Sequence, residues 1–179
     1  RHAPQIDGKL DDACWENATV LEPFAQLNGA PASVQTTAKV CYNAGGIFVS
    51  VLCEEPAMDR ISKKVRKRDG NAWTDDCVEL FLDTGNDHAT YFHFILTAGN
   101  VQYDAACDLQ KWDKSWNGEW ESAVFEGPNF WAAEIRIPFD TLKTESARPG
   151  DTWGLNVVRE RQMGATEVTA WIPTHGSPH

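Results

Sequence analysis

Short runs of alternating apolar and polar residues, separated by turn residues, constrain the fold of this chain most. Alternation with a period of two is typical of strands that bury one face. The turn residues at 43–46 and 98–100 each join two runs, which predicts two hairpins. The series predicts an all-β fold, a jelly-roll-like antiparallel β-sandwich. The expected strands span residues 34–42, 47–53, 78–83, 90–97, 101–105, 130–137, 152–161 and 168–172.

Helix signals are few, and two connections are long. Single helical turns are expected at 13–16 and 139–142. Residues 54–76 and 106–120 show no strand pattern, so the sandwich should carry long decorated loops. Long irregular segments in compact domains are often functional. Both segments contain tryptophan: Trp73 lies in the first, and Trp112, Trp116 and Trp120 lie in the second.

Length and hydropathy indicate one globular domain over residues 1–179. A chain of 179 residues can bury a full core, and a hydrophobic content of 42% is that of a globular protein. No apolar run approaches the ~20 residues that span a bilayer, so membrane insertion is not expected. The chain opens on Arg1-His2-Ala3-Pro4 and not on a signal peptide. We therefore interpret it as a segment excised from a longer or processed protein.

The formal net charge of −10 narrows the range of partners. Phosphate-rich partners, such as nucleic acid and anionic membrane surfaces, are disfavoured by repulsion. Neutral polymers, small molecules and cations remain. A basic cluster at residues 63–68 opposes the trend. We interpret this cluster as a solvated strand or loop edge, and the alternative is a grip for an acidic polysaccharide.

The five cysteines do not form the pattern of a disulfide framework. Their odd number leaves at least one thiol unpaired within the chain. Cys41, Cys53 and Cys77 stand inside apolar alternations, which predicts small core residues. Neither a CxxC motif nor a Cys/His spacing typical of zinc sites occurs.

The segment from Trp73 to Glu79 carries the clearest functional chemistry. A tryptophan and two aspartates precede a strand-like run that begins at Val78. An indole ring can stack on the C–H face of a pyranose while carboxylates accept its hydroxyl hydrogens. The alternative is structural: Trp73 covers the sheet and the aspartates end a loop.

Several segments together resemble the family 9 carbohydrate-binding modules and their DOMON-like relatives. The resemblance covers nearly the whole chain in the same order and implies a jelly-roll-like β-sandwich. In the sugar-binding members, two tryptophans clamp a terminal saccharide unit, helped by a glutamate, an arginine and amides. The segments that carry it include Ile6-Asp7-Gly8-Lys9-Leu10-Asp11, Trp73 to Asp83, Glu134 to Phe139, Gly150 to Asn156 and Trp171-Ile172-Pro173-Thr174.

The resemblance assigns Trp73 as the stacking platform and Glu79 as a hydroxyl acceptor. Other positions depart, because Ile95 and Thr97 stand where an arginine and an asparagine would lie, and no tryptophan follows Trp171. The further candidates for ligand contacts are Asp76, His175 and His179, with Trp112 and Trp116 as a second wall. The remaining element-like tryptophans, Trp15, Trp131, Trp153 and Trp171, are expected in the core.

The resulting hypothesis is a non-catalytic module that binds a saccharide chain end or a short oligosaccharide. We expect it in a larger extracellular or cell-surface protein, for example as an accessory module of a polysaccharide-degrading enzyme. No nucleophile motif favours intrinsic catalysis. One alternative is a structural or interaction module without a sugar site. Another is a haem domain of DOMON type, with Met58, Met163, His88 and His93 as the candidate axial ligands.

The resemblance also allows structural calcium. Calcium takes 6–8 oxygen ligands, often from loops. Asp83 and Asp87 in one turn and Asp104 further along are the proposed ligands, and Asn86, Asp108 and Asp113 lie nearby in sequence. The alternative is a set of solvated acidic loops.

Overall fold

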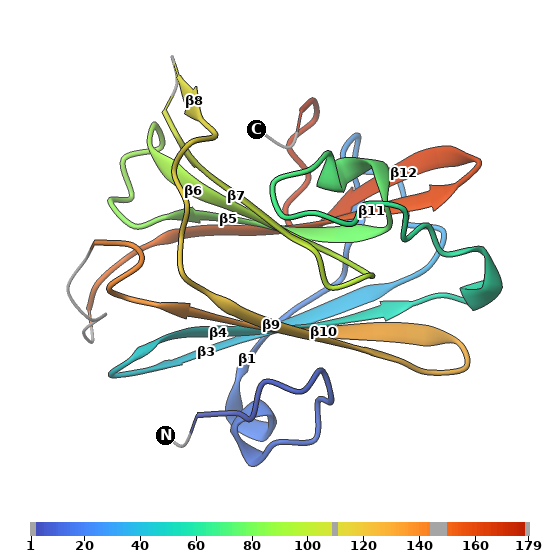
Figure 1. Ribbon diagram of the computed structural model, residues 1–179, viewed down its shortest axis with the longest axis horizontal. Coiled ribbons are helices and arrows are strands. Elements are labelled where there is room, and N and C mark those ends of the chain that lie inside the picture. The colour runs from blue at the N-terminus through green and yellow to red at the C-terminus, as the bar shows by residue number, and fades with distance from the viewer. Residues whose placement is uncertain (1–2, 109–110, 144–149, 178–179) are drawn as a thin grey trace.

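The computed structural model describes residues 3–108, 111–143 and 150–177, and it consists of two antiparallel sheets packed face to face (Figure 1). The five-stranded sheet has the order β1-β3-β4-β10-β9 and the seven-stranded sheet the order β2-β12-β11-β5-β6-β7-β8. The strands of the first sheet are β1 (Thr19–Leu21), β3 (Thr36–Asn43), β4 (Gly46–Glu54), β9 (Glu121–Glu126) and β10 (Phe130–Pro138). Those of the second are β2 (Ala25–Gln26), β5 (Cys77–Asp83), β6 (Tyr91–Thr97), β7 (Gln102–Cys107), β8 (Trp112–Asp113), β11 (Gly154–Met163) and β12 (Ala165–Ala170). Three short 3₁₀ turns complete the elements: η1 (Ala13–Asn17), η2 (Met58–Arg60) and η3 (Ala72–Thr74).

The predicted antiparallel sandwich and both predicted hairpins are confirmed. β3 pairs with β4 across the turn from Asn43 to Gly46, and β6 pairs with β7 across the turn from Leu96 to Gln102. Alternate residues of each strand face the space between the sheets. The core there is apolar and fully buried; its members include Val49, Val51, Leu80, Leu82, Phe94, Trp131, Ile135 and Val157.

Four strands have no counterpart in the sequence prediction: β1, β2, β8 and β9. Three of them have only two or three residues, and β9 is mostly exposed or half-buried at the sheet edge. Edge strands need less apolar alternation, because partner strands cover less of them. The last strand, β12, begins at Ala165 and ends at Ala170, whereas the sequence predicted a strand at residues 168–172.

The N-terminal segment covers the outer face of the five-stranded sheet (Figure 1, blue). Glu134 on β10 accepts hydrogen bonds from the backbone N–H of Asp7 (3.0 Å) and Gly8 (2.9 Å), and from Nε1 of Trp15 (2.8 Å). Gly8 has φ +84°, and a Cβ there would lie 2.6 Å from the carbonyl carbon of Val124. Only glycine fits such a close approach with positive φ. The outer face of the seven-stranded sheet is therefore the one left for a site.

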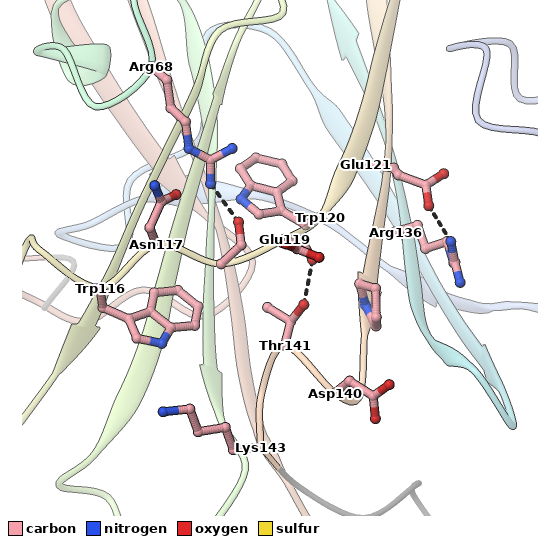
Figure 2. Close-up of a pocket in the computed structure, with 12 residues that line it drawn as sticks. Arg68, Trp116, Asn117, Glu119, Trp120, Glu121, Arg136, Asp140, Thr141 and Lys143 are labelled. Carbon is pink, nitrogen blue, oxygen red and sulfur yellow. Dashed lines mark hydrogen bonds and ion pairs between the residues drawn. The ribbon is translucent and has the colours of Figure 1, made fainter.

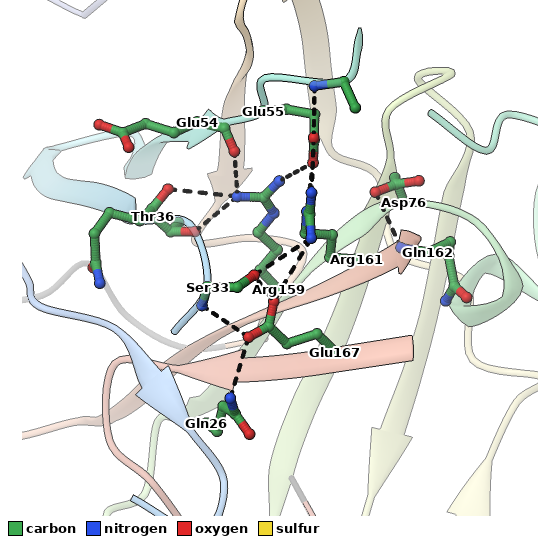
Figure 3. Close-up of polar contacts among 12 residues, drawn as sticks. Gln26, Ser33, Thr36, Glu54, Glu55, Asp76, Arg159, Arg161, Gln162 and Glu167 are labelled. Carbon is green, nitrogen blue, oxygen red and sulfur yellow. Dashed lines mark hydrogen bonds and ion pairs between the residues drawn. The ribbon is translucent and has the colours of Figure 1, made fainter. Parts of the chain in front are cut away.

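A buried ion network joins the two layers at one end of the sandwich (Figure 3). Arg159 on β11 is 1% exposed and Glu55, just after β4, is 0% exposed. Glu55 accepts from Nη2 of Arg159 (3.2 Å) and, through both oxygens, from Arg161 (2.6 and 3.0 Å). Nη1 of Arg159 donates to the carbonyl of Glu54 at 2.9 Å. These charge-assisted bonds pair the two buried charges, although Nε of Arg159 has no hydrogen-bond partner.

The expected core residues behave as predicted. Cys41, Cys53 and Cys77 are buried, and all five cysteines of the chain are free thiols. Trp15 and Trp131 are fully buried, whereas Trp153 and Trp171 are half-buried against the core. Within the part of the chain that is described, no helix has the length and apolar character needed to cross a membrane.

Candidate functional site

Three segments frame the outer face of the seven-stranded sheet. The η3 turn, the β8 hairpin and the C-terminal segment all rise on the side of this sheet that faces away from the five-stranded sheet (Figure 1, green, yellow and red). Strands β11, β5, β6 and β7 form the floor between them. The site candidates from sequence can be placed on this frame one by one.

Trp73 lies in η3 and leans over the floor. Its half-buried ring meets Tyr103 of β7 edge-on, with ring centroids 5.7 Å apart, and it packs near Ile95 of β6. Its carbonyl oxygen accepts a hydrogen bond of 3.1 Å from Nε2 of Gln162 on β11. Trp73 thus has a fixed backbone and a partly open ring, as a stacking platform requires.

The two aspartates after Trp73 hold the loop that carries it. Asp75 accepts from the hydroxyl of Ser62 (2.8 Å) and from the backbone N–H of Lys64 and Val65 (2.9 and 2.7 Å). Asp76 is 0% exposed and accepts from the N–H of Ser62 (2.8 Å). It also accepts from the N–H of Gln162 at 3.3 Å (Figure 3). Burial raises the pKa of Asp76, and these bonds oppose the rise. The structure places Asp76 in the scaffold, which differs from the predicted direct contact.

Glu79 lies on the floor, but it is 3% exposed. Its Oε2 is 2.6 Å from Nε2 of His93 on β6, and the His93 ring stacks on Phe81. Burial lowers the pKa of His93 to about 3, so this contact is a hydrogen bond of a neutral imidazole. Its other oxygen, Oε1, is buried as well, so the structure does not expose Glu79 as the predicted hydroxyl acceptor.

Glu79 also lies beside a second carboxylate, Glu160 on β11, with one oxygen of each group within 4.8 Å of the other. Burial raises the pKa of both groups, and the negative charge of Glu79 raises the pKa of Glu160 further. The pair therefore retains a proton at pH values where isolated carboxylates are ionised. A pair that shares one proton can both donate and accept a hydrogen bond.

Trp112 is a second tryptophan on this face, and unlike Trp73 it is exposed. It lies on β8, is 41% exposed, and its ring centroid is 5.7 Å from that of His93. The ammonium of Lys114 lies 5.5 Å from the ring centroid of Trp73 and 5.3 Å from that of Trp112. Both indoles therefore face one small space, now occupied by a cation.

Trp116 belongs to a different part of the molecule. Its ring packs on Phe92 and Phe94, whose side chains point into the core between the sheets, at centroid distances of 4.9 and 5.8 Å. It lines an open cleft of about 1050 Å³ together with Arg68, Trp120 and Thr141 (Figure 2). The predicted second wall is thus split, with Trp112 beside Trp73 and Trp116 on the opposite side of the sheet.

The C-terminal candidates lie at the far rim of the face. His175 is exposed, has φ +57°, and its N–H donates to the carbonyl of Leu27 at 2.8 Å. It lines a shallow hollow of about 290 Å³ with Asn28 and Val168. His179 lies outside the described residues.

The three aspartates proposed for calcium do not gather at one point. Asp83 and Asp87 form a local turn, in which Asp83 accepts from the N–H of His88 and Asp87 from the N–H of Thr90. Asp104 is 0% exposed and pairs with Arg68, the N–H of Gly118 and Nε1 of Trp120. Asp104 therefore does not fit a calcium site, because its oxygens already bind an arginine and two N–H groups. Calcium at the Asp83–Asp87 turn stays a prediction.

Four residues of this face were not identified as sugar-site residues from the sequence: His93, Tyr103, Lys114 and Glu160. His93 and Tyr103 alternate outward on strands that were predicted correctly. Glu160 could have been found from the strand alternation only with the register, which places it directly opposite Cys77. No sequence pattern indicated Lys114 as a site residue, because its position depends on the hairpin that contains β8.

Comparison with known proteins agrees with the fold. Residues 6–176 match the family described as "Carbohydrate family 9 binding domain-like". No curated protein matches the chain. A family 9 carbohydrate-binding module from Caldicellulosiruptor kristjanssonii in complex with cellotriose is similar in structure, with TM-score 0.69, 18% identity and coverage of 94% of this chain and 78% of the other. A module of that family and organism in complex with glucose gives TM-score 0.68, 17% identity and coverage of 97% and 88%.

Proposed function

Because the chain belongs to the carbohydrate family 9 binding domain-like family, we propose that it is a non-catalytic carbohydrate-binding module. Its ligand is a saccharide chain end or a short oligosaccharide, bound on the outer face of the seven-stranded sheet. The observation that carries this proposal is the pair of indoles, Trp73 and Trp112, that face one space from η3 and β8. Two rings on opposite sides of a pyranose bury both of its apolar faces.

The polar floor supports the same ligand class. Glu160, the half-buried member of the pair, can donate or accept a hydrogen bond with a sugar hydroxyl while it shares a proton with Glu79. Gln162, which binds the carbonyl of Trp73, adds an amide beside Glu160. His175 is proposed as a contact at the rim for a longer chain. The arginine of the family pattern is replaced by Ile95, which is 1% exposed, so we expect weaker binding than with a full set of donors.

Titration calorimetry with glucose and cellotriose tests this function, since similar structures hold these two sugars. We expect saturable binding by the chain and a loss of about tenfold or more in Trp73→Ala, because one ring contact contributes ~0.5–1.5 kcal/mol beyond its buried area. Trp112→Ala should weaken binding by a similar factor. Circular dichroism must show that both variants keep the fold.

Trp116→Ala is the matched control, because Trp116 lines the other cleft. It should keep sugar affinity within about twofold. If Trp116→Ala abolishes binding and Trp73→Ala does not, the sugar site is the cleft of Figure 2 and the assignment made here is wrong. If no sugar binds, the interaction-module alternative replaces the carbohydrate proposal.

The setting of this module is also part of the proposal. We place it in a larger extracellular or cell-surface protein that acts on or adheres to polysaccharide. The net charge of −10 suits a neutral ligand and opposes polyanions.

A further inference from the structure

Three potential metal ligands meet on the outer face of the seven-stranded sheet beside Trp73. Cys77 and Glu79 are two residues apart on β5, so both side chains point to the same face. Glu160 on β11 is directly opposite Cys77 in the strand register. The Sγ of Cys77 and one oxygen of each glutamate all lie within 4.8 Å of one another. Small side-chain rotations would bring all three to one ion.

The surroundings leave this cluster without a compensating charge. Cys77 is 0% exposed and Glu79 3% exposed. Oε1 of Glu79 is buried, and among the described residues no N–H group or hydroxyl donates to it, so a proton can come only from Glu160. Among the ion pairs of the described residues, no lysine or arginine pairs with Glu79 or Glu160. Two carboxylates in contact with a buried thiol are unfavourable unless a proton or a cation separates them.

Neighbouring side chains hold the two carboxylates in place. His93 binds Oε2 of Glu79 at 2.6 Å and leaves Oε1 without a bond to this imidazole. Nε2 of Gln162 lies 3.5 Å from Oε2 of Glu160 and also binds the carbonyl of Trp73. Hydrogen bonds to ligating groups are the usual way in which proteins orient metal ligands.

From this geometry we propose that Cys77, Glu79 and Glu160 bind a zinc ion. One thiolate and two carboxylates form a mixed sulfur and oxygen donor set that suits a tetrahedral zinc ion. Calcium is disfavoured, because it requires 6–8 oxygen ligands and does not choose sulfur. Binding releases to solvent both the thiol proton of Cys77 and the proton that Glu79 and Glu160 share. Three protein ligands leave a fourth position for water, on a face where a sugar hydroxyl can also approach.

The test uses metal alone, so that it is independent of sugar binding. The chain is reduced, stripped with a chelator, and titrated with Zn²⁺ by calorimetry and with Co²⁺ by absorption spectroscopy. We expect one ion per chain and a thiolate-to-cobalt charge-transfer band in the near ultraviolet. Cys77→Ser should abolish this band and weaken Zn²⁺ binding by tenfold or more.

Two more variants keep the result interpretable. Glu160→Gln is nearly isosteric and should weaken Zn²⁺ binding by tenfold or more while the charge-transfer band persists at saturating Co²⁺. Cys107→Ser removes another buried thiol of the same apolar cluster and should change neither measurement. The proposal is overturned by the absence of saturable Zn²⁺ binding, or by a cobalt–thiolate band that survives Cys77→Ser. Neither of these outcomes affects the sugar-binding proposal, which calorimetry with cellotriose tests separately.

Discussion

At the scale of single residues, Lys114 decides how the space between Trp73 and Trp112 is used. Its ammonium lies over both rings, so a sugar that enters between them must displace it. An exposed cation–π contact contributes ~0.5–1 kcal/mol, which corresponds to about two- to fivefold in affinity. Lys114→Ala should therefore tighten cellotriose binding by about two- to fivefold in calorimetry.

Lys111 provides the matched control for this prediction. It is an exposed lysine three positions earlier in the same hairpin. Lys111→Ala removes the same charge without vacating the space between the rings, so its sugar affinity should not change. A loss of affinity in Lys114→Ala would mean that the ammonium itself contacts the sugar. An equal gain in both variants would indicate a general effect of charge.

At the scale of elements, Asp104 on β7 holds the segment that follows β8. It accepts from Arg68, from the N–H of Gly118 and from Nε1 of Trp120. Asp104→Ala leaves the buried N–H of Gly118 and Nε1 of Trp120 without this acceptor, and each costs ~1–3 kcal/mol. We expect urea denaturation to show a loss of about 3 kcal/mol or more in the free energy of unfolding. Exposed Asp140→Ala is the control and should have little effect.

A chelator distinguishes two roles of Asp104, as an acceptor for protein donors or as a calcium ligand. Because its oxygens are occupied by protein donors, EDTA should not reproduce the destabilisation of Asp104→Ala. If EDTA lowers the free energy of unfolding of the wild-type chain by the same amount, and the variant does not respond to it, Asp104 is a metal ligand and the assignment made here fails.

The elements also show what the sequence could predict. The central strands of both sheets show strong apolar alternation, because one face of each strand is buried. The sequence alone therefore predicted β3 to β7 and β10. Trp73 and Glu79 were identified through the resemblance, and both lie on the outer face of the seven-stranded sheet. The burial of Glu79, however, depends on His93 and Glu160, which reach it from neighbouring strands. Such cross-strand contacts follow from register, which alternation alone does not define.

The predicted second aromatic wall, Trp112 and Trp116, also shows what the sequence alone could not predict. Trp112 and Trp116 are four residues apart in a segment without a strand pattern. The short pairing of β8 with β7 directs Trp112 to the outer face, whereas Trp116 packs on Phe92 and Phe94. A two-residue strand has no pattern to detect, and so the sequence could not separate the two rings.

At the scale of the whole molecule, the two layers are joined at one end by buried charge. Glu55 follows a strand of the five-stranded sheet, and Arg159 and Arg161 belong to the seven-stranded sheet (Figure 3). Removing one partner of such a network leaves an uncompensated buried charge and costs ~3–5 kcal/mol. Since salt screens buried pairs little, this contribution should persist at high ionic strength.

The network gives the fold a specific response to acid. Burial raises the pKa of Glu55, but hydrogen bonds from Arg161 and the N–H of Ala57, with the charges of Arg161 and Arg159, outweigh it and lower the pKa below its ordinary value of 4.5. A depressed carboxylate pKa stabilises the folded state above the unfolded pKa, and this stabilisation is lost as pH falls through the folded value. The free energy of unfolding should therefore decrease as the pH falls below about 4.5.

Urea denaturation at several pH values tests this expectation. The free energy of unfolding should decrease less steeply with falling pH in Glu55→Gln than in the exposed control Glu16→Gln. Equal slopes in the two variants would mean that other carboxylates carry the acid response, and if Glu55→Gln does not fold at all, its loss at neutral pH already shows the network to be essential.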